Sequence, residues 1–240
     1  MSFTVPIAPN ASTVDLALLV VELILLVSTF TVIVLNRKEE KVRESVVEKM
    51  LHTARIVSRQ EYFNSVIFGI QGSSKEILGS ITGSKPNSEM LEQVNRIAQE
   101  LKRASDKGVR IRYLVPKSID RLKVACIYES AGAEVRFHPG LLVMDIRYMI
   151  VDGNHVVLGL PGEKGENNPT REGYLVPSNG LADMFIEIFE RRWKEATLCD
   201  NYIKEIVNEL KLHNANITPS KLSSELEVPE TKILEIVPLN

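Results

Sequence analysis

The chain has 240 residues, of which 44% are apolar and 25% charged, and this composition excludes a wholly disordered protein. Its 29 Lys and Arg residues all lie at Arg37 or later, and only two of its 31 acidic residues, Asp15 and Glu22, precede that position. The portion from residue 37 onward is therefore close to neutral, which argues against a broad nucleic-acid-binding surface.

The apolar run from Leu16 to Leu35 predicts a transmembrane helix within residues 14–36, after a short outer tail of residues 1–13. A helix of about 20 apolar residues spans about 30 Å, the thickness of a hydrocarbon core. Basic residues follow the run directly, beginning with Arg37 and Lys38, and none precede it. The positive-inside rule therefore predicts a single-pass anchor in the lipid bilayer, with the N-terminus outside and the rest in the cytoplasm.

Glu22 is the one charged residue inside this run. A carboxylate within the bilayer costs about 2 kcal/mol or more unless it is protonated, paired or near the interface. Two interpretations stay open: Glu22 meets a polar group on a partner transmembrane helix, or it is neutral and simply tolerated.

Residues 37–60 carry charged residues with apolar ones at helical intervals, which predicts a juxtamembrane helix. Residues 61–198 then alternate between helical and extended patterns and end in a hairpin, so we expect an α/β domain, a sandwich with a mixed sheet. The predicted helices are 61–72, 89–106 with Ser88 as cap, 118–131 and 178–196. The predicted strands are 76–82, 109–115, 134–138, 144–151, 155–160 and 174–176.

Three segments of this domain, in this order, resemble the phospholipase D-like superfamily. They are a helix followed by Gly108-Val109 and a strand ending at Pro116, the strand and turn 145–153, and residues 171–176 followed by the helix that ends near Trp193. The resemblance implies a phospholipase D-like α/β sandwich covering about half the chain.

The family's catalytic motif, H-x-K-x4-D, is altered here. Its spacing is kept, but Asp145 stands in place of the His and Arg147 in place of the Lys, so that only Asp152 matches. In the family the His attacks phosphorus, and a carboxylate repels a phosphodiester and makes a poor covalent intermediate. We therefore expect no catalytic residues and a degenerate, non-catalytic relative.

The degenerate motif can still form a polar site, with Asp145 and Arg147 on one face of a strand and Glu172 nearby if the family geometry holds. One interpretation is a ligand-binding pocket in which Arg147 holds an anionic or hydroxylated ligand, with Asp145, Asp152 and Glu172 around it. The other is a partly buried ion pair of Arg147 with Asp145 and Glu172. Single-copy members of the family commonly pair, so we also expect a homodimer.

No metal or cofactor is expected, because neither His138 nor His155 has metal-ligand spacing to another His or Cys. Cys126 and Cys199 show no Cys-x-x-Cys spacing and are interpreted as reduced structural thiols.

Residues 199–240 predict a small helical appendage with helices near 202–212, 219–226 and 229–236, and 217–233 resembles a helix-turn-helix. A helix that reads bases needs Arg, Lys, Asn or Gln, and this one offers Lys232 against Glu230 and Glu235. A packing or protein-interaction module is favoured over DNA binding.

The leading hypothesis is a membrane-anchored, catalytically inactive phospholipase D-like protein that senses a ligand or docks a protein on the cytoplasmic face. The first alternative is a membrane-tethered transcriptional regulator, because related non-catalytic domains occur in archaeal regulators that sense small molecules beside a helix-turn-helix. The second is a phosphodiesterase of the phospholipase D class.

Overall fold

The computed structural model describes residues 55–83, 85–141, 146–160, 172–214 and 217–236. The chain divides into two compact units, Met1–His52 and Thr53–Asn240, and the second contains all of the described helices and strands. None of the helices in these described ranges is both long and apolar enough to cross a membrane. The predicted transmembrane helix, with Glu22, lies outside the described residues.

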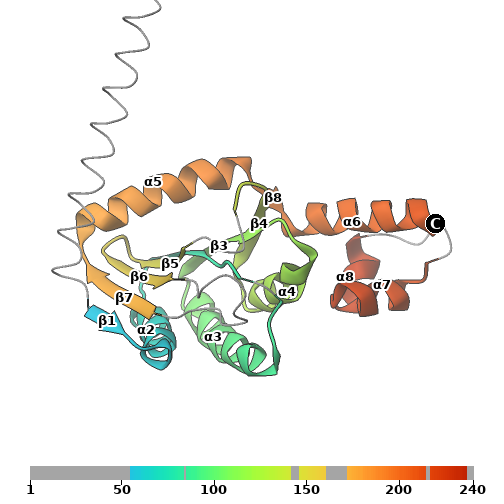
Figure 1. Ribbon diagram of the computed structural model, residues 1–240. Coiled ribbons are helices and arrows are strands. Elements are labelled where there is room, and N and C mark those ends of the chain that lie inside the picture. Colours follow the sequence, from blue (N-terminus) through green and yellow to red (C-terminus); the bar gives the residue numbers. More distant parts are fainter. Residues whose placement is uncertain (1–54, 84, 142–145, 161–171, 215–216, 237–240) are drawn as a thin grey trace, which may run out of the picture. The chain divides into compact units, whose positions relative to one another are not determined.

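A mixed sheet of eight strands runs through the unit in the order β1-β7-β6-β5-β2-β3-β4-β8 (Figure 1). Strands β2, β3 and β4 are parallel to one another, and β5 joins this half to the antiparallel half by pairing with β2. The strands are β1 (Arg55–Val57), β2 (Glu76–Ser80), β3 (Arg110–Pro116), β4 (Glu134–His138), β5 (Arg147–Val151), β6 (His155–Leu160), β7 (Glu172–Pro177) and β8 (Thr197–Leu198). The predicted α/β class with a mixed sheet is confirmed.

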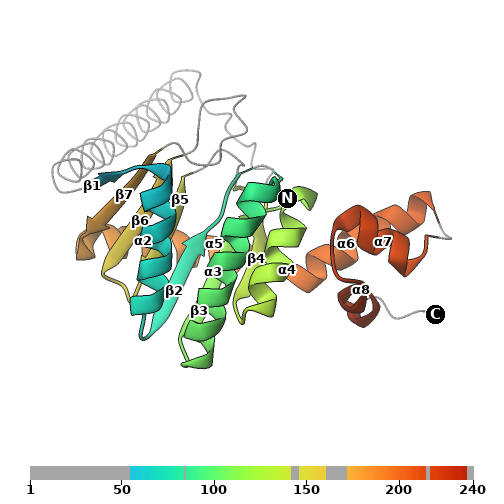
Figure 2. The same cartoon turned by 90° about the horizontal axis from the view of Figure 1, so that it is seen from below.

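Helices cover both faces of the sheet. Figures 1 and 2 show α2 (Arg59–Gly72), α3 (Ser88–Asp106) and α4 (Leu122–Ser130) on one face and α5 (Asn179–Glu195) on the other. The main hydrophobic core lies under α2, α3 and α4, where Ile77, Leu101 and Phe137 are fully buried. Burial of side chains of this size stabilises the fold by about 1.5–3 kcal/mol each.

Helices α2, α3 and α5 begin where the sequence supplies side-chain caps. Ser58 and Glu61 form a capping box at α2, Asn87 accepts from the Met90 amide at α3, and Ser178 accepts from the Leu181 amide at α5. Each cap satisfies a backbone N–H that has no partner inside the helix. Asn87, rather than the expected Ser88, therefore caps α3.

The prediction of a helix over 37–60 is wrong near its C-terminal end, where the chain forms a strand. Arg55–Val57 pairs with β7 as the edge strand β1, and the following helix α2 begins at Arg59. The physical reason is the Ser58 cap, since an N-cap residue has extended backbone and the residues before it are free to join a sheet. Residues 37–54 lie outside the described residues.

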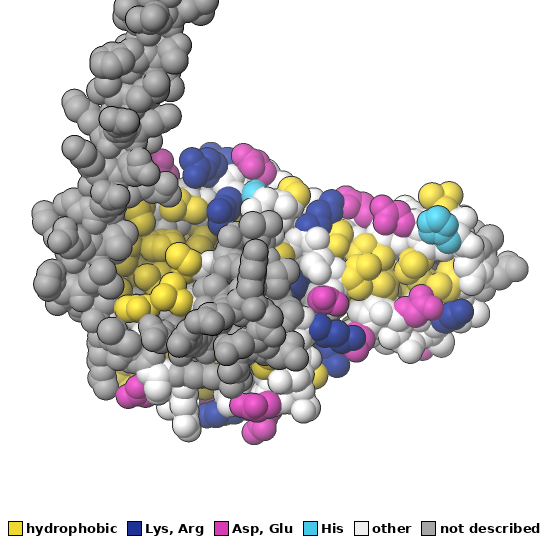
Figure 3. All heavy atoms as spheres, in the orientation of Figure 1, with side chains coloured by type: hydrophobic (Ala, Val, Ile, Leu, Met, Phe, Trp, Pro, Cys, Tyr) yellow, Lys and Arg dark blue, Asp and Glu magenta, His cyan; other side chains and the backbone are white. Residues whose placement is uncertain are grey.

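Three helices follow the sheet, as the sequence predicted: α6 (Cys199–His213), α7 (Pro219–Leu226) and α8 (Glu230–Ile236). Thr218 caps α7 and Pro219 fills its first turn, while Glu227 ends it in a left-handed conformation with φ of 54°. Figure 3 shows apolar side chains gathered over this part of the unit. The buried Ile203, Leu222 and Ile233 pack with the main core.

Candidate functional site

Two arginines are buried side by side where strands β2 and β3 end and β5 begins. Arg147 is the first residue of β5 and is 8% exposed, and Arg121 is the last residue of a 3-10 turn (Ile119–Arg121) after β3 and is 2% exposed. Both side chains line one small cavity of about 80 Å³ between the sheet and helices α2, α3 and α4. In α/β sheets the carboxyl ends of parallel strands are the usual place for a ligand.

Gly83 shows how close the two guanidinium groups come. A Cβ at this position would overlap Nη2 of Arg147 and would lie 3.0 Å from Nη2 of Arg121, so both groups crowd the same point of the backbone. Gly83 has a backbone φ of 111°, a conformation that residues other than glycine rarely adopt. The absence of a side chain at Gly83 therefore allows both the turn after β2 and the close approach of the two guanidinium groups.

The two arginines differ in their partners. Arg147 donates from Nε to the Thr82 hydroxyl at 3.4 Å. Among the described residues, Nε and Nη2 of Arg121 are buried without a hydrogen-bond partner. Burial and the neighbouring charge of Arg147 lower the pKa of Arg121 to about 10, while the nearby Asp120 acts in the opposite direction but is itself exposed.

Tyrosines form part of the wall of the cavity, and most of the remaining lining residues, such as Met90 and Ile97, are apolar. Tyr62 comes from α2, Tyr113 from β3 and Tyr128 from α4, and all three are buried. Desolvation raises the pKa of each phenol, so all three stay protonated and can donate or accept hydrogen bonds. Tyr62 fits because the place opposite its ring is Gly159, where a Cβ would come within 2.8 Å of the ring.

Asp152, the one residue that matches the family motif, does not gather with Arg147. Asp152 lies at the opposite end of β5, and its carboxylate accepts from the amides of Ser74, Lys75 and Glu76 and from the Ser74 hydroxyl at 2.8–2.9 Å. Asp152 therefore holds the β5–β6 turn against the start of β2 and is not part of the cavity.

Two of the predicted site residues cannot be placed as side chains. Asp145 lies outside the described residues, and Glu172 is placed only by its backbone, paired with Leu160 at the start of β7. Since Gly159 in β6 pairs with Arg147, the backbone of Glu172 lies two strands away from β5. Sequence reasoning missed Arg121, since nothing in its local sequence distinguishes it from a surface residue of a turn.

The remaining candidates have structural partners. His138 is buried, accepts the Gly140 amide at Nδ1 and lies 3.4 Å from Glu195, and His155 contacts Asn154. The described residues contain no group of His, Cys, Asp or Glu that could hold a metal ion. Cys126 and Cys199 are free and buried.

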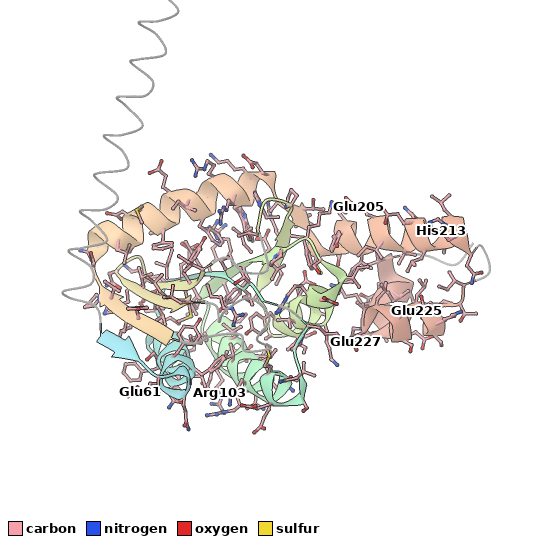
Figure 4. The ribbon with its side chains drawn as sticks, in the orientation of Figure 1. Glu61, Arg103, Glu205, His213, Glu225 and Glu227 are labelled. Atoms are coloured by element: carbon pink, nitrogen blue, oxygen red, sulfur yellow. The ribbon has the colours of Figure 1, made fainter. Side chains whose placement is uncertain are left out.

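Lys232 of α8 is held by two acids. Its Nζ lies 2.5 Å from Glu129 on α4 and 2.9 Å from Asp200 on α6, with 22% of the side chain exposed. The α8 residues left on the surface include Glu230 and Glu235. Figure 4 shows Glu205 on α6 and Glu225 on α7, two further acids of this helical segment. The helix offers no cation to a DNA groove.

A second hollow lies against the outer side of α2. It measures about 470 Å³ and is mainly apolar, with Phe68, Val157 and Leu175 in its wall. Phe68 is 77% exposed. The charged or titratable residues of its wall, Glu61 and His155, are exposed, whereas the arginine cavity holds two buried cations and is the better candidate site.

Comparison with known proteins gives a match to one family and a set of weak structural likenesses. Residues 86–200 match the family model described as "Transcriptional regulator TrmB, EBD N-terminal subdomain". No curated protein matches the chain.

Three solved structures are similar to this chain at low identity. Nuc from Salmonella typhimurium, a phospholipase D family member, is 15% identical, with a TM-score of 0.48 over 60% of this chain and 96% of its own. NucT from Helicobacter pylori is also 15% identical, with a TM-score of 0.48 over 60% of this chain and 98% of its own. TrmBL2, an archaeal chromatin protein, is 19% identical, with a TM-score of 0.45 over 67% of this chain and 62% of its own.

Proposed function

We propose that this chain is a membrane-anchored, catalytically inactive, phospholipase D-like protein whose α/β unit senses a small ligand on the cytoplasmic face. The observation that carries the proposal is the cavity in which Arg147 lies, because it combines a buried cation, phenol groups and a position at the strand ends. A pocket with a few convergent polar groups is the usual form of a small-molecule site.

The altered motif lacks the groups that catalysis in this family requires. Asp145 replaces the nucleophilic His of the family motif. Asp152 is the one residue that matches that motif, and its carboxylate accepts hydrogen bonds from backbone amides. Leu160 and Pro161-Gly162 stand where the family has polar residues that help to bind phosphate. A chain with these changes keeps the binding scaffold and lacks the group that would attack phosphorus.

The sensing role is supported by the matched family, since residues 86–200, which include Arg121 and Arg147, match the model of a subdomain of a transcriptional regulator. The anchor, its orientation and pairing into a homodimer are proposed from the apolar run, the basic flank and the single copy of the domain. In this picture a partner helix at Glu22 or a docked protein receives the signal.

Two assays on the full-length protein in detergent test this proposal. The protein should not turn over a generic phosphodiester, and small molecules released from it by heat should include a ligand that Arg147→Ala no longer retains. Turnover that disappears in Arg147→Ala would overturn the non-catalytic assignment. Release of the same molecules from wild type and Arg147→Ala would remove the cavity as the sensing site.

A membrane-tethered transcriptional regulator is the second candidate, favoured by the regulator family that matches residues 86–200. Helices α7 and α8 have the short connection of a helix-turn-helix. Against it, Lys232 is engaged with Glu129 and Asp200. Salt-sensitive retention of DNA that is lost when residues 201–240 are deleted would favour this candidate.

A further inference from the structure

The cavity contains more positive charge than a neutral ligand needs. Arg121 and Arg147 are both nearly inaccessible, and their Nη2 atoms crowd the same position beside Gly83. Two buried guanidinium groups repel each other, and burial adds a desolvation cost to each charge. The fold therefore brings two cations close together, and an anion between them would offset their repulsion.

The unsatisfied hydrogen-bond donors of Arg121 also favour an anionic ligand. Its Nε and Nη2 are buried and have no acceptor among the described residues, although a planar guanidinium usually offers such donors to a carboxylate or phosphate. The acid that acts on it electrostatically, Asp120, is exposed and lies outside the cavity. Within the described part of the chain, Arg121 is thus a buried donor that has no acceptor for Nε and Nη2, as at a site that receives a ligand.

The size of the cavity limits what can enter. At about 80 Å³ it has the volume of a few water molecules, each of about 30 Å³, so it takes a compact group. Tyr62 and Tyr128 bring phenol groups near the two arginines, and Thr82 is bonded to Arg147. These neighbours are neutral and polar, as the surroundings of a bound oxyanion are.

We infer that Arg121 and Arg147 together form a binding site for one small oxyanion, a phosphate or carboxylate group, which bridges the two guanidinium groups. This inference rests on the proposed sensing function and names its ligand class. Arg121 lies outside the degenerate motif, so the site is formed by the tertiary structure and not by the motif itself.

The test measures thermal unfolding and calorimetric binding of the full-length protein in detergent with inorganic phosphate and with acetate, against sodium chloride at equal ionic strength. Wild type should bind at least one of the two oxyanions, and its thermal stability should rise with the concentration of that oxyanion. Arg121→Met and Arg147→Met should each weaken binding by about tenfold or more, because each removes a charge-assisted contact. Arg103→Met is the matched control, since Arg103 is exposed on α3 (Figure 4) and forms an ion pair with Glu100, and this variant should bind like wild type.

The outcomes separate the possibilities. Binding of phosphate alone or of acetate alone identifies the chemical group that the site prefers. Equal binding of both shows that the site recognises the negative charge and does not distinguish the two groups. Binding of neither, or binding that survives in both Arg→Met variants, overturns the oxyanion site. If heat releases a neutral small molecule from wild type and not from Arg147→Ala, the oxyanion inference fails while the sensing function stands.

Discussion

Replacing Asp152 tests whether the one motif residue retained in this chain is there for stability. Its carboxylate accepts four hydrogen bonds: Oδ2 from the Ser74 amide and hydroxyl, and Oδ1 from the Lys75 and Glu76 amides. Hydrogen bonds to a charged group contribute about 1.5–3 kcal/mol, and those to one partly exposed carboxylate are not additive. We expect Asp152→Ala to lower the free energy of unfolding by about 2–3 kcal/mol and Asp152→Asn by about half as much.

The measurement is denaturant unfolding followed by the fluorescence of Trp193, the single tryptophan of the chain. Its side chain is buried between α5 and the sheet, so its emission reports on this unit. Asp183→Asn serves as the control, because Asp183 is exposed on α5 and its replacement should change stability by less than about 0.5 kcal/mol. A loss for Asp152→Ala no larger than that of the control would refute the reasoning.

The same residue predicts a dependence on pH. Partial burial raises the pKa of Asp152, but the hydrogen bonds from Glu76, Lys75 and Ser74 outweigh it and hold the pKa below its ordinary value. Stability from a lowered carboxyl pKa is present above the unfolded value of about 3.9 and is lost as the pH falls through the folded value. The stability difference between wild type and Asp152→Asn should therefore be constant near neutral pH and shrink below about pH 4; a difference unchanged at pH 3 would contradict this.

Two further substitutions test the crowded turn and the C-terminal helices. Gly83→Ala should cost more than about 1 kcal/mol, because the backbone is left-handed there and the new Cβ would meet Arg147, whereas Gly72→Ala, with open space around it, should be near neutral in the same unfolding assay. Lys232→Met should leave the half-buried carboxylate of Glu129 without its cation and destabilise the packing of α8 by about 1–3 kcal/mol. Amide hydrogen exchange should then become faster in α8 and stay unchanged in α3. Equal protection of α8 in wild type and Lys232→Met would show that the ion pair does not hold α8 in place.

Local signals determined most of the secondary structure. Extended patterns in the sequence located β2 to β6, the turn at Asp152-Gly153 located the β5–β6 hairpin, and the helix predicted over 178–196 corresponds to α5. The altered H-x-K-x4-D spacing likewise identified Arg147 as a candidate ligand-binding residue. These features depend on neighbours within a few residues, so they can be recognised along the chain.

The sequence by itself determined the α/β class, the residues of the degenerate motif and the prediction of an anchor at residues 14–36. Tertiary structure alone decided that Arg55–Val57 joins the sheet edge, that Asp152 binds backbone amides from β2, and that Arg121 meets Arg147. Pairing between β1 and β7 joins residues more than a hundred positions apart, and Arg121 and Arg147 come from different elements of the fold. Contacts between residues so distant in sequence depend on how strands pack side by side, which no local pattern of residues specifies.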